Sequence, residues 1–536
     1  MKINEEFEKS RNLIFIAIVL IFTMAFYKTA WVAEDAFITF RVINNTLDGL
    51  GLVWNSGERV QVYTHPLWFF ILLPLTGLFD DPFYVVIFLS YFLLVLTLYF
   101  SYRALKNHRW WALFPICSLL WSRSFVDYSS SGLENPLLHL LAVLFFWMWI
   151  ERKDAGLASL LISLLFLTRP DAVVLFFPAF LFLCFQDRRW GRIFIGLIPI
   201  ISWVIFSLFY YGSPVPNTAL AKVGTGLAVQ DRFVQAVYYF QWIYENDKVT
   251  LPILILGIIS GFLNKRFLAF SLGILLFTAY LFYVGADYMG GRFLSMPTLL
   301  AALLFSCVAG RVLVSLLMSY LLLSFNSLML TVFSPPNFNQ AVIENGIADE
   351  RGFYYQWLGL SPSLRQGGWT LHPWFQAGLV LPGLYTRCAI GMAGFASEKT
   401  VRWIDPMALA EPFLARLPAK SKSRIGHHER ALPAGYLESM VSGENKIVDK
   451  ALSDLYADVD MVVRKPLFAK GRFKAVWRLN TGYYKEIFDN FDREAIGLPG
   501  VPISDKSPLS CYGVSSGWNY TWQIVGVPAT AVSVNR

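Results

Sequence analysis

Charged residues are scarce in this chain of 536 residues. Lys, Arg, Asp and Glu together make up 15% of it, whereas soluble globular chains contain about 25%. Hydrophobic residues make up 56%, and the mean hydropathy is +0.49. So few charges exclude a wholly soluble protein, and most of the chain is expected to lie in a lipid bilayer.

Signatures of metal and nucleotide binding are also missing. The five cysteines form neither a Cys-x-x-Cys pair nor a zinc spacing, and no P-loop or Gly-x-Gly-x-x-Gly run occurs. Cys117, Cys184 and Cys307 lie in apolar runs and are expected in the core. Cys388 and Cys511 could form a disulfide if their part of the chain faces an oxidising compartment. No metal site is predicted and no motif specifies a cofactor, although a divalent cation remains an open alternative.

The net charge of +8 does not indicate a nucleic-acid partner. Within 1–333, many of the Lys and Arg residues fall in short loops between apolar runs, where they set the orientation of a membrane protein. The 18 Trp residues and an aromatic content of 17% are typical of membrane-interface belts and of stacking on sugars. No internal repeat or low-complexity segment is visible.

The apolar runs predict a polytopic α-helical membrane protein. A span needs about 20 apolar residues, and the first run lacks a small-residue cleavage site, so we expect it to be a retained span. The run at 65–79 contains two prolines and would be only about 22 Å long as a helix; we predict that it does not cross. The eleven predicted spans lie at 12–30, 82–102, 110–124, 134–150, 156–168, 171–186, 193–211, 250–263, 267–284, 293–309 and 312–333.

The basic loops then all fall on one side, which is cytoplasmic by the positive-inside rule. This predicts a membrane module at 1–333 and an extracytoplasmic soluble domain at 334–536, either α+β or β-rich. Since the cytoplasmic loops are short, any chemistry is expected on the outer side, which is the periplasm for a bacterial inner-membrane protein. The short runs on either side of residues 169–171 predict a hairpin whose tip reaches that side.

Two adjacent acids, Glu34 and Asp35, follow the first span directly. Carboxylates at a membrane boundary are costly unless they are paired or functional, because the low dielectric penalises charge. If 34–45 is helical, Glu34 and Arg41 share a face, so an ion pair that merely orients the loop is one interpretation. The other is catalysis by a transferase acting on a lipid-linked sugar. Such an enzyme needs a carboxylate to accept a proton and cations, such as Arg41 and Arg59, at the leaving phosphate.

Further charged groups stand at the outer ends of the predicted spans. Arg169 and Asp171 could bind a donor phosphate or pair with each other. Asp287 and Arg292 flank two glycines that allow close backbone approach; Arg292 could bind phosphate or extend toward lipid headgroups. Glu134 begins a span, where an acid also stabilises a helix N-terminus. His427 and His428 are more consistent with structural or acceptor contacts than with metal binding.

A family resemblance emerges from these motifs taken together. Residues 34–41 (EDAFITFR), 48–60 (DGLGLVWNSGERV) and 63–68 (YTHPLW) resemble the first outer loop of the mycobacterial terminal β-arabinofuranosyltransferases. Further matches cover the membrane part, and weaker ones lie in the C-terminal part. They are 131–134 (SGLE), 167–171 (LTRPD), 210–218 (YYGSPVPNT), 285–293 (GADYMGGRF), 403–406 and 426–433.

The resemblance implies the C-type glycosyltransferase fold and a polyprenyl-phosphoryl arabinofuranose donor. It implies a catalytic acid pair, in which Asp35 is favoured as the base because the second position of the pair keeps its residue type, with Glu34 in support. The implied donor and phosphate ligands are Arg41, Arg59, Arg169, Arg292, Lys222 and Asn217. The implied substrate contacts are Tyr63, His65, Glu134, Asp171 and Asp287.

Two departures from the family pattern leave the acceptor open. Glu34 replaces the first acid of the pair, and His65 stands where the mycobacterial proteins usually have Asn. A different acceptor is one explanation, and a related Gram-negative branch arabinosylates type IV pilins. The expected acceptor is therefore a pilin or a cell-wall glycan.

Two other functions are compatible with an apolar, aromatic-rich chain: a transporter of lipid-linked sugars and a carbohydrate-binding membrane protein without catalysis. Transporters tend to carry polar groups in mid-span and repeated halves. Here the charges gather at one membrane face and no repeat is visible, which favours the enzyme.

Overall fold

The computed structural model describes residues 2–223, 225–333, 343–421, 423, 425–491 and 522–523. The chain divides into two compact units, each assembled from three stretches of sequence. Unit 1 comprises 1–33, 65–200 and 229–369, and unit 2 comprises 34–64, 201–228 and 370–536. The predicted division at 333/334 concerns membrane topology, which these units do not test, so it stays a prediction.

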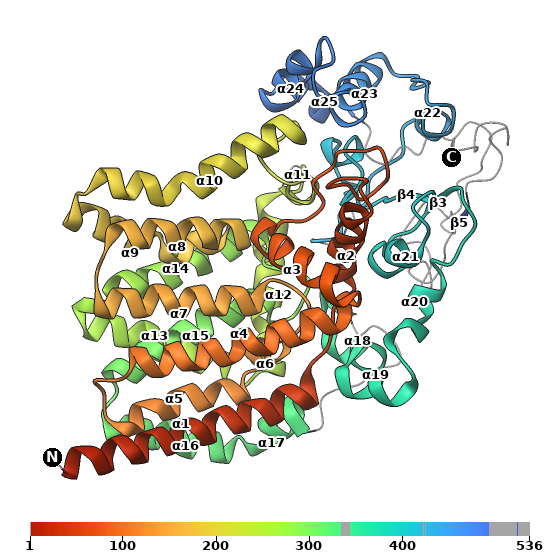
Figure 1. The fold of residues 1–536 in the computed structure, drawn as a ribbon. Coiled ribbons are helices and arrows are strands. Elements are labelled where there is room, and N and C mark those ends of the chain that lie inside the picture. Colours follow the sequence, from red (N-terminus) through yellow and green to blue (C-terminus); the bar gives the residue numbers. More distant parts are fainter. Residues whose placement is uncertain are drawn as a thin grey trace. The chain divides into compact units, whose positions relative to one another are not determined.

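Unit 1 is built from apolar helices that lie side by side in Figure 1. A short hairpin of strands β1 (Ile343–Glu344) and β2 (Ile347–Ala348) completes it. The helices wholly within it are α1 (Lys2–Thr29), α3 (Pro66–Phe79), α4 (Pro82–Ala104), α5 (Phe114–Cys117), α6 (Arg123–Asp127), α7 (Asn135–Glu151), α8 (Ala155–Thr168), α9 (Ala172–Asp187), α12 (Val229–Asn246), α13 (Thr250–Leu263), α14 (Leu268–Val284), α15 (Ser295–Val308), α16 (Arg311–Leu323), α17 (Phe325–Leu328), α18 (Glu350–Leu358) and α19 (Leu360–Gln366).

Helix α10 (Trp190–Tyr210) belongs to unit 1 up to Ile200 and to unit 2 from Ile201. It carries large apolar side chains on its surface, such as Ile195 and Ile205, which are 64% and 62% exposed. Extended apolar surface of this kind is unusual in a soluble protein and typical of a lipid-facing helix.

Among the described residues, four helices are long and apolar enough to cross a membrane, or up to six if each of two bent pairs forms one span. The four are 10–29, 82–104, 190–210 and 265–284. They indicate a membrane protein. The predicted spans at 110–124, 134–150, 156–168, 171–186 and 293–309 fall on shorter apolar helices, so the predicted count of eleven is not established.

The hairpin predicted around residues 169–171 is confirmed, since α8 ends at Thr168 and α9 begins at Ala172. Asp154 caps α8 by accepting a hydrogen bond from the Leu157 amide at 2.8 Å. The membrane face that the tip reaches remains a prediction, as does the expectation that α3, with Pro74 inside it, does not cross.

Unit 2 contains short helices and a small sheet in which β3 (Leu384–Thr386) pairs in parallel with β4 (Arg402–Ile404) and antiparallel with β5 (Trp522–Gln523). Buried aromatic side chains, including Trp54, Trp403, Phe413 and Tyr436, form part of its core. Its helices besides the end of α10 are α2 (Glu34–Leu47), α11 (Asn217–Val223), α20 (Pro373–Gln376), α21 (Gly391–Ala396), α22 (Tyr436–Ser442), α23 (Lys450–Val463), α24 (Arg472–Asn480) and α25 (Lys485–Asn490).

Cys388 is disulfide-bonded in unit 2. Cys511, the partner that the sequence suggests for it, lies outside the described residues. Cys117, Cys184 and Cys307 are free thiols, as expected for cysteines in apolar helices.

Candidate active site

Six of the predicted site residues come together in unit 1 around one buried carboxylate. Glu134 is 1% exposed. Its Oε1 lies 2.9 Å from Arg292 Nη2 and 3.2 Å from Arg169 Nη1, and its Oε2 lies 3.3 Å from His65 Nδ1. Arg169 Nε also contacts Asp171 Oδ1 at 2.8 Å, and Arg292 Nη1 stands 4.0 Å from Asp287 Oδ2. We call these residues the ionic cluster: His65, Glu134, Arg169, Asp171, Asp287 and Arg292.

The helix ends of unit 1 position the cluster. Glu134 immediately precedes α7, His65 precedes α3, and Arg169 and Asp171 occupy the tip of the α8–α9 hairpin. Arg292 begins a short 3-10 turn, 292–294, that leads into α15. Charges at helix ends can be satisfied by one another, whereas in mid-helix they would face apolar neighbours. Of the alternatives for Glu134, its side chain makes no capping hydrogen bond to α7 and pairs with the two arginines instead.

Three supporting residues were not predicted from the sequence. The Asn135 amide donates to Ser295 Oγ at 2.9 Å and to the Arg292 carbonyl at 3.4 Å. The Phe293 ring lies 4.0 Å from the Arg169 guanidinium carbon, a cation–π contact. Asn135 and Phe293 directly follow Glu134 and Arg292 in the chain, so adjacency to a charged motif was the signal available.

Strand β2 forms backbone hydrogen bonds with the loop that carries Asp287 and Arg292. The Gly290 amide donates to the Ala348 carbonyl at 3.0 Å, and the Ala348 amide donates to the Tyr288 carbonyl at 2.7 Å. A Cβ on Gly290 would lie 2.5 Å from the Trp242 ring, and Gly291 has φ +87°, which favours glycine. The close backbone approach predicted for this glycine pair is confirmed.

Gly290→Ala is therefore expected to displace the loop. Overpacking of this kind costs about 1–3 kcal/mol, and moving Arg292 by about 1 Å would lower turnover by about 10²-fold. Gly310→Ala is the matched control, because nothing lies within 4 Å of a Cβ built there. Thermal unfolding and turnover of the two purified variants check the prediction, which is wrong if both behave alike.

A second buried ionic group, not predicted from the sequence, supports the same region. Arg123 Nη2 contacts Asp349 Oδ2 at 2.8 Å and Asp127 Oδ2 at 3.4 Å, and Arg351 Nη1 contacts Asp127 Oδ1 at 2.8 Å. Asp349 follows β2 directly, and Arg123 lies over the ring of Trp242. These contacts fix the strand and the Trp side chain that back the loop of Arg292.

The cavity beside the ionic cluster is small in this conformation. It is lined in part by Asn135, Arg169, Asp171 and Arg292, and its volume is about 10 Å³, enough for about one water molecule. A phosphate group would not fit this cavity unless the side chains that line it moved.

The adjacent acids lie at the start of α2 in unit 2. Glu34 is 6% exposed, and its Oε1 accepts a hydrogen bond from the Met392 amide at 3.0 Å. Burial raises the pKa of Glu34 to about 8; the neighbouring Asp35 adds to this increase, and the Met392 amide and Arg387 oppose it. Asp35 is half-buried. Glu34 is therefore anchored to the 391–392 backbone and mostly protonated at neutral pH.

The side chain of Arg41 binds the backbone of unit 2. Its Nε donates to the Trp54 carbonyl at 2.8 Å, its Nη2 to the Val401 carbonyl at 3.0 Å, and its Nη1 to Gly394 and Ser397. These bonds give Arg41 a structural role in this conformation, distinct both from phosphate binding and from an ion pair with Glu34.

Arg59 likewise binds backbone. Its Nη2 donates to the Val462 carbonyl at 3.0 Å and to the Lys465 carbonyl, at the C-terminal end of α23. A cation there satisfies carbonyls that lack partners within the helix. Both arginines were predicted as phosphate ligands; the structure shows them engaged in holding segments of unit 2 together.

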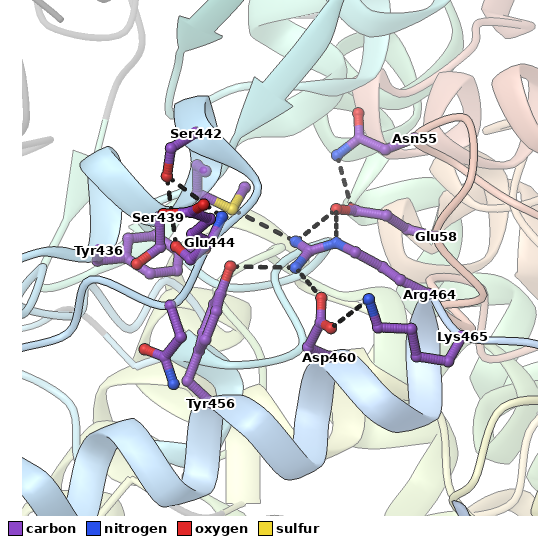
Figure 2. A network of polar contacts seen from close by, with 12 residues as sticks. Asn55, Glu58, Tyr436, Ser439, Ser442, Glu444, Tyr456, Asp460, Arg464 and Lys465 are labelled. Carbon is purple, nitrogen blue, oxygen red and sulfur yellow. Dashed lines mark hydrogen bonds and ion pairs between the residues drawn. The ribbon is translucent and has the colours of Figure 1, made fainter. Parts of the chain in front are cut away.

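The neighbouring Glu58 anchors the polar network drawn in Figure 2. It contacts Arg464 at 2.8 Å, Arg402, and the Asn55 amide at 3.3 Å. Burial opposes ionisation of this carboxyl, but Arg402 and Arg464 outweigh it and lower the pKa of Glu58 to about 2. The network thus joins the loop before Arg59 to α23 and β4.

Glu58→Gln should destabilise unit 2 by about 3 kcal/mol, because it removes the carboxylate that Arg402 contacts and leaves Arg464 with Asp460 alone. The pKa of Glu58 lies below the usual 4.5 in the folded state. Its stabilisation is therefore present above pH 4.5 and is lost as pH falls toward about 2. Thermal unfolding of wild type and variant should differ at neutral pH and converge in acid. Glu444→Gln is the control and should change nothing, because the Glu444 side chain is 69% exposed; equal melting of Glu58→Gln and wild type at pH 7 would contradict the prediction.

The other predicted residues of unit 2 also make local contacts. The Asn217 amide donates to the carbonyls of Ala408 and Leu409 at 2.9 and 3.0 Å. The Tyr63 and Tyr211 hydroxyls are 2.9 Å apart. Burial lowers the pKa of His428 to about 3, and the cations Arg430 and Lys222 lower it further. Within the described part of the chain, no three His, Cys, Asp or Glu side chains are arranged to hold a metal ion.

Comparisons with known proteins bear on the family. The chain is 25% identical, over 530 residues, to a terminal β-(1→2)-arabinofuranosyltransferase of Mycobacterium tuberculosis (strain ATCC 25618 / H37Rv); the match covers 78% of this chain and 83% of that protein. It is 25% identical, over 345 residues, to a protein of the same name from Corynebacterium glutamicum, covering 50% of this chain and 46% of that protein. No protein-family model and no solved structure matches.

The match to the mycobacterial protein extends well beyond residues 34–68, and the resemblance predicted from the motifs is confirmed. It does not distinguish a pilin-modifying branch. Over most of its length, this chain resembles the terminal β-(1→2)-arabinofuranosyltransferases.

Proposed function

We propose that this protein is an inner-membrane glycosyltransferase that moves arabinofuranose from a polyprenyl-phosphate donor to an acceptor on the periplasmic side. The observation that carries the proposal is the ionic cluster. Four motifs that underlie the family resemblance bring His65, Arg169 and Arg292 onto the single carboxylate of Glu134, from which Arg292 is 158 residues away in the chain. Buried charges converging from separate motifs favour a functional site over independent structural ion pairs.

The cluster suits the leaving group of this reaction. As the bond between the anomeric carbon and the phosphate oxygen breaks, charge develops on the phosphate, and guanidinium groups held in fixed positions stabilise it. We assign this role to Arg292 and Arg169. Glu134 is a positioning residue, because it contacts both guanidinium groups.

The position of His65 refines one expectation. His65 departs from the Asn that the mycobacterial sequences usually carry, and an altered acceptor is one explanation of that departure. His65 Nδ1 contacts Glu134. The residue that differs from the mycobacterial sequences therefore belongs to the ionic cluster, whose arginines we assign to the donor phosphate. We therefore place His65 with donor binding, and a pilin or a cell-wall glycan both remain candidate acceptors.

The acid pair supplies the proton transfer. The acceptor hydroxyl attacks the anomeric carbon and loses its proton to a carboxylate, for which we propose Asp35. The Met392 amide already engages Glu34, which supports a positioning role for that residue. Asp287 and Asp171 hold Arg292 and Arg169 from the other side. We propose that Tyr63, Asn217 and Lys222 line the substrate site.

A panel of donors and acceptors tests the proposal. Purified protein would be offered polyprenyl-phosphoryl arabinofuranose or polyprenyl-phosphoryl mannose, each with a pilin and with an arabinan oligosaccharide, with and without a chelator of divalent cations. We expect mass spectrometry to show a gain of one pentose on one acceptor, with the arabinofuranose donor only. Transfer of mannose alone would assign another sugar. Vectorial movement of intact donor lipid in vesicles, without transfer, would assign a transporter instead.

A further inference from the structure

The segment from Arg464 to Lys485 in unit 2 has an unusual composition. It contains seven basic residues and no Asp or Glu. The segment includes α24, and its basic residues are Arg464, Lys465, Lys470, Arg472, Lys474, Arg478 and Lys485.

This segment also exposes large aromatic side chains. Phe468 is 80% exposed, Phe473 61% and Trp477 71%. Phe473 and Trp477 are four residues apart and share one face of α24, whereas Arg472 and Ala475 on the opposite side are buried. Lys465, Lys470 and Lys474 are exposed as well. We call these six side chains the aromatic–lysine face: Lys465, Phe468, Lys470, Phe473, Lys474 and Trp477.

The face is attached to the end of a helix that can span a membrane. Helix α10 ends at Tyr210 and is one of the four candidate spans. Within unit 2, Arg472 Nη2 donates to the Tyr210 carbonyl at 3.1 Å, and the Asn480 amide donates to the Gly212 carbonyl at 2.8 Å. The rings of Phe468 and Phe209 are 5.6 Å apart. The end of a span lies at the membrane–water boundary, so these contacts hold α24 at that level.

The junction of α23 and α24 with the turn after α10 is tightly packed. A Cβ on Gly212 would lie 2.2 Å from Val462 and 3.2 Å from Val476. Because Val462 lies at the end of α23 and Val476 lies in α24, both helices pack directly on the turn that follows α10. Figure 1 shows α24 beside this end of α10.

We propose that the aromatic–lysine face docks onto the surface of the lipid bilayer, with Phe468, Phe473 and Trp477 entering the headgroup region and the lysines binding anionic headgroups. Aromatic rings favour the membrane interface, and lysines near an anionic leaflet add electrostatic attraction. No acid occurs in 461–485, and although Lys465 Nζ lies 3.4 Å from Asp460 Oδ2, Lys470 and Lys474 keep the face positively charged and complementary to such a surface. The docking fixes the height of unit 2 relative to the membrane and does not depend on the reaction that the protein catalyses.

Site-specific fluorescence in the full-length protein tests this docking. A fluorescent amino acid would replace Phe473 or Trp477, and Leu381 as the control, since Leu381 is 79% exposed in the same unit. The proteins would be placed in nanodiscs of phosphatidylcholine, with or without phosphatidylglycerol, that contain a nitroxide-labelled lipid. We expect quenching at 473 and 477 to exceed that at 381 by at least about twofold, because interfacial helices bury their apolar face about 5–10 Å deep.

A charge variant keeps the test independent of the aromatic substitutions. Replacing Lys465, Lys470 and Lys474 together by Gln should reduce quenching at 477 in the anionic discs to the level in neutral discs, while thermal unfolding stays unchanged. Equal quenching at 381 and 477 in both lipids would overturn the proposal. The proposal would also be overturned if replacing the lysines left the quenching unchanged and position 477 bound an acidic protein. The face would then serve a protein partner.

Discussion

Replacing Asp35 with Asn is expected to lower the rate of sugar transfer by about 10²–10⁴, the usual contribution of a general base. The amide keeps the size of the side chain but cannot accept the proton of the acceptor hydroxyl at neutral pH. Folding should be little affected, because Asp35 is only half-buried. Initial rates with saturating donor, together with thermal unfolding, measure both effects.

Glu34→Gln and Asp48→Asn provide the comparison. Glu34→Gln should lose less activity than Asp35→Asn, and Asp48→Asn, which changes an exposed acid at the end of α2 paired with Lys399, should lose none. If Glu34 were the base, the rate would rise with pH up to about 8, since burial raises its pKa to that value and only the ionised form accepts a proton. A rising limb near pH 8 that disappears in Glu34→Gln, with Asp35→Asn active, would reverse the two roles.

Arg292→Ala is expected to lower turnover by about 10²–10³, the usual cost of losing one preorganised donor at a developing charge. Arg292→Lys should also be impaired, because an ammonium group keeps the charge but loses the planar pair of donors that matches a phosphate. Removing Arg292 also leaves Glu134 with one fewer partner, so a loss of stability is expected as well. Turnover should therefore be compared at a temperature at which both variants remain folded.

Arg311→Ala is the matched control for Arg292. Arg311 is exposed at the start of α16 in the same unit, so its removal should leave turnover unchanged. The kcat and KM of Arg292→Ala should be measured separately. Removing a residue that binds the phosphate in the transition state lowers kcat even at saturating donor. Turnover of Arg292→Ala equal to that of wild type would remove Arg292 from the site.

The sequence was most informative where charge interrupts apolar runs. His65, Glu134, Arg169 and Arg292 stand beside helix ends, and because burying a charge is costly, the sequence alone is enough to mark such positions. The hairpin at 169–171 and the close backbone approach at Gly290 could likewise be predicted from local sequence. A pairing across 158 residues, such as that of Glu134 with Arg292, depends on which helices become neighbours, and periodicity does not encode that.

The arginines of residues 34–64 show the limit of such reasoning. Arg41 and Arg59 stand in the motifs that carry the resemblance, and a cation beside an acid pair suggested phosphate binding. In the structure both donate to backbone carbonyls of segments more than 300 residues away. A single sequence does not distinguish a residue that holds distant segments together from a residue that binds a ligand. Arg123 and Asp349 illustrate the opposite case, because no local pattern distinguished them.

The most direct test of the proposed activity is the transfer reaction itself. Purified protein in detergent, without any energy source, would receive polyprenyl-phosphoryl arabinofuranose carrying a radiolabelled sugar, together with the acceptor identified by the panel. The proposal predicts that the label moves into the acceptor while an equal amount of polyprenyl phosphate is released, and that Asp35→Asn and Arg292→Ala strongly reduce both. Release of free arabinose without transfer, or an intact donor after incubation with every acceptor, would contradict it.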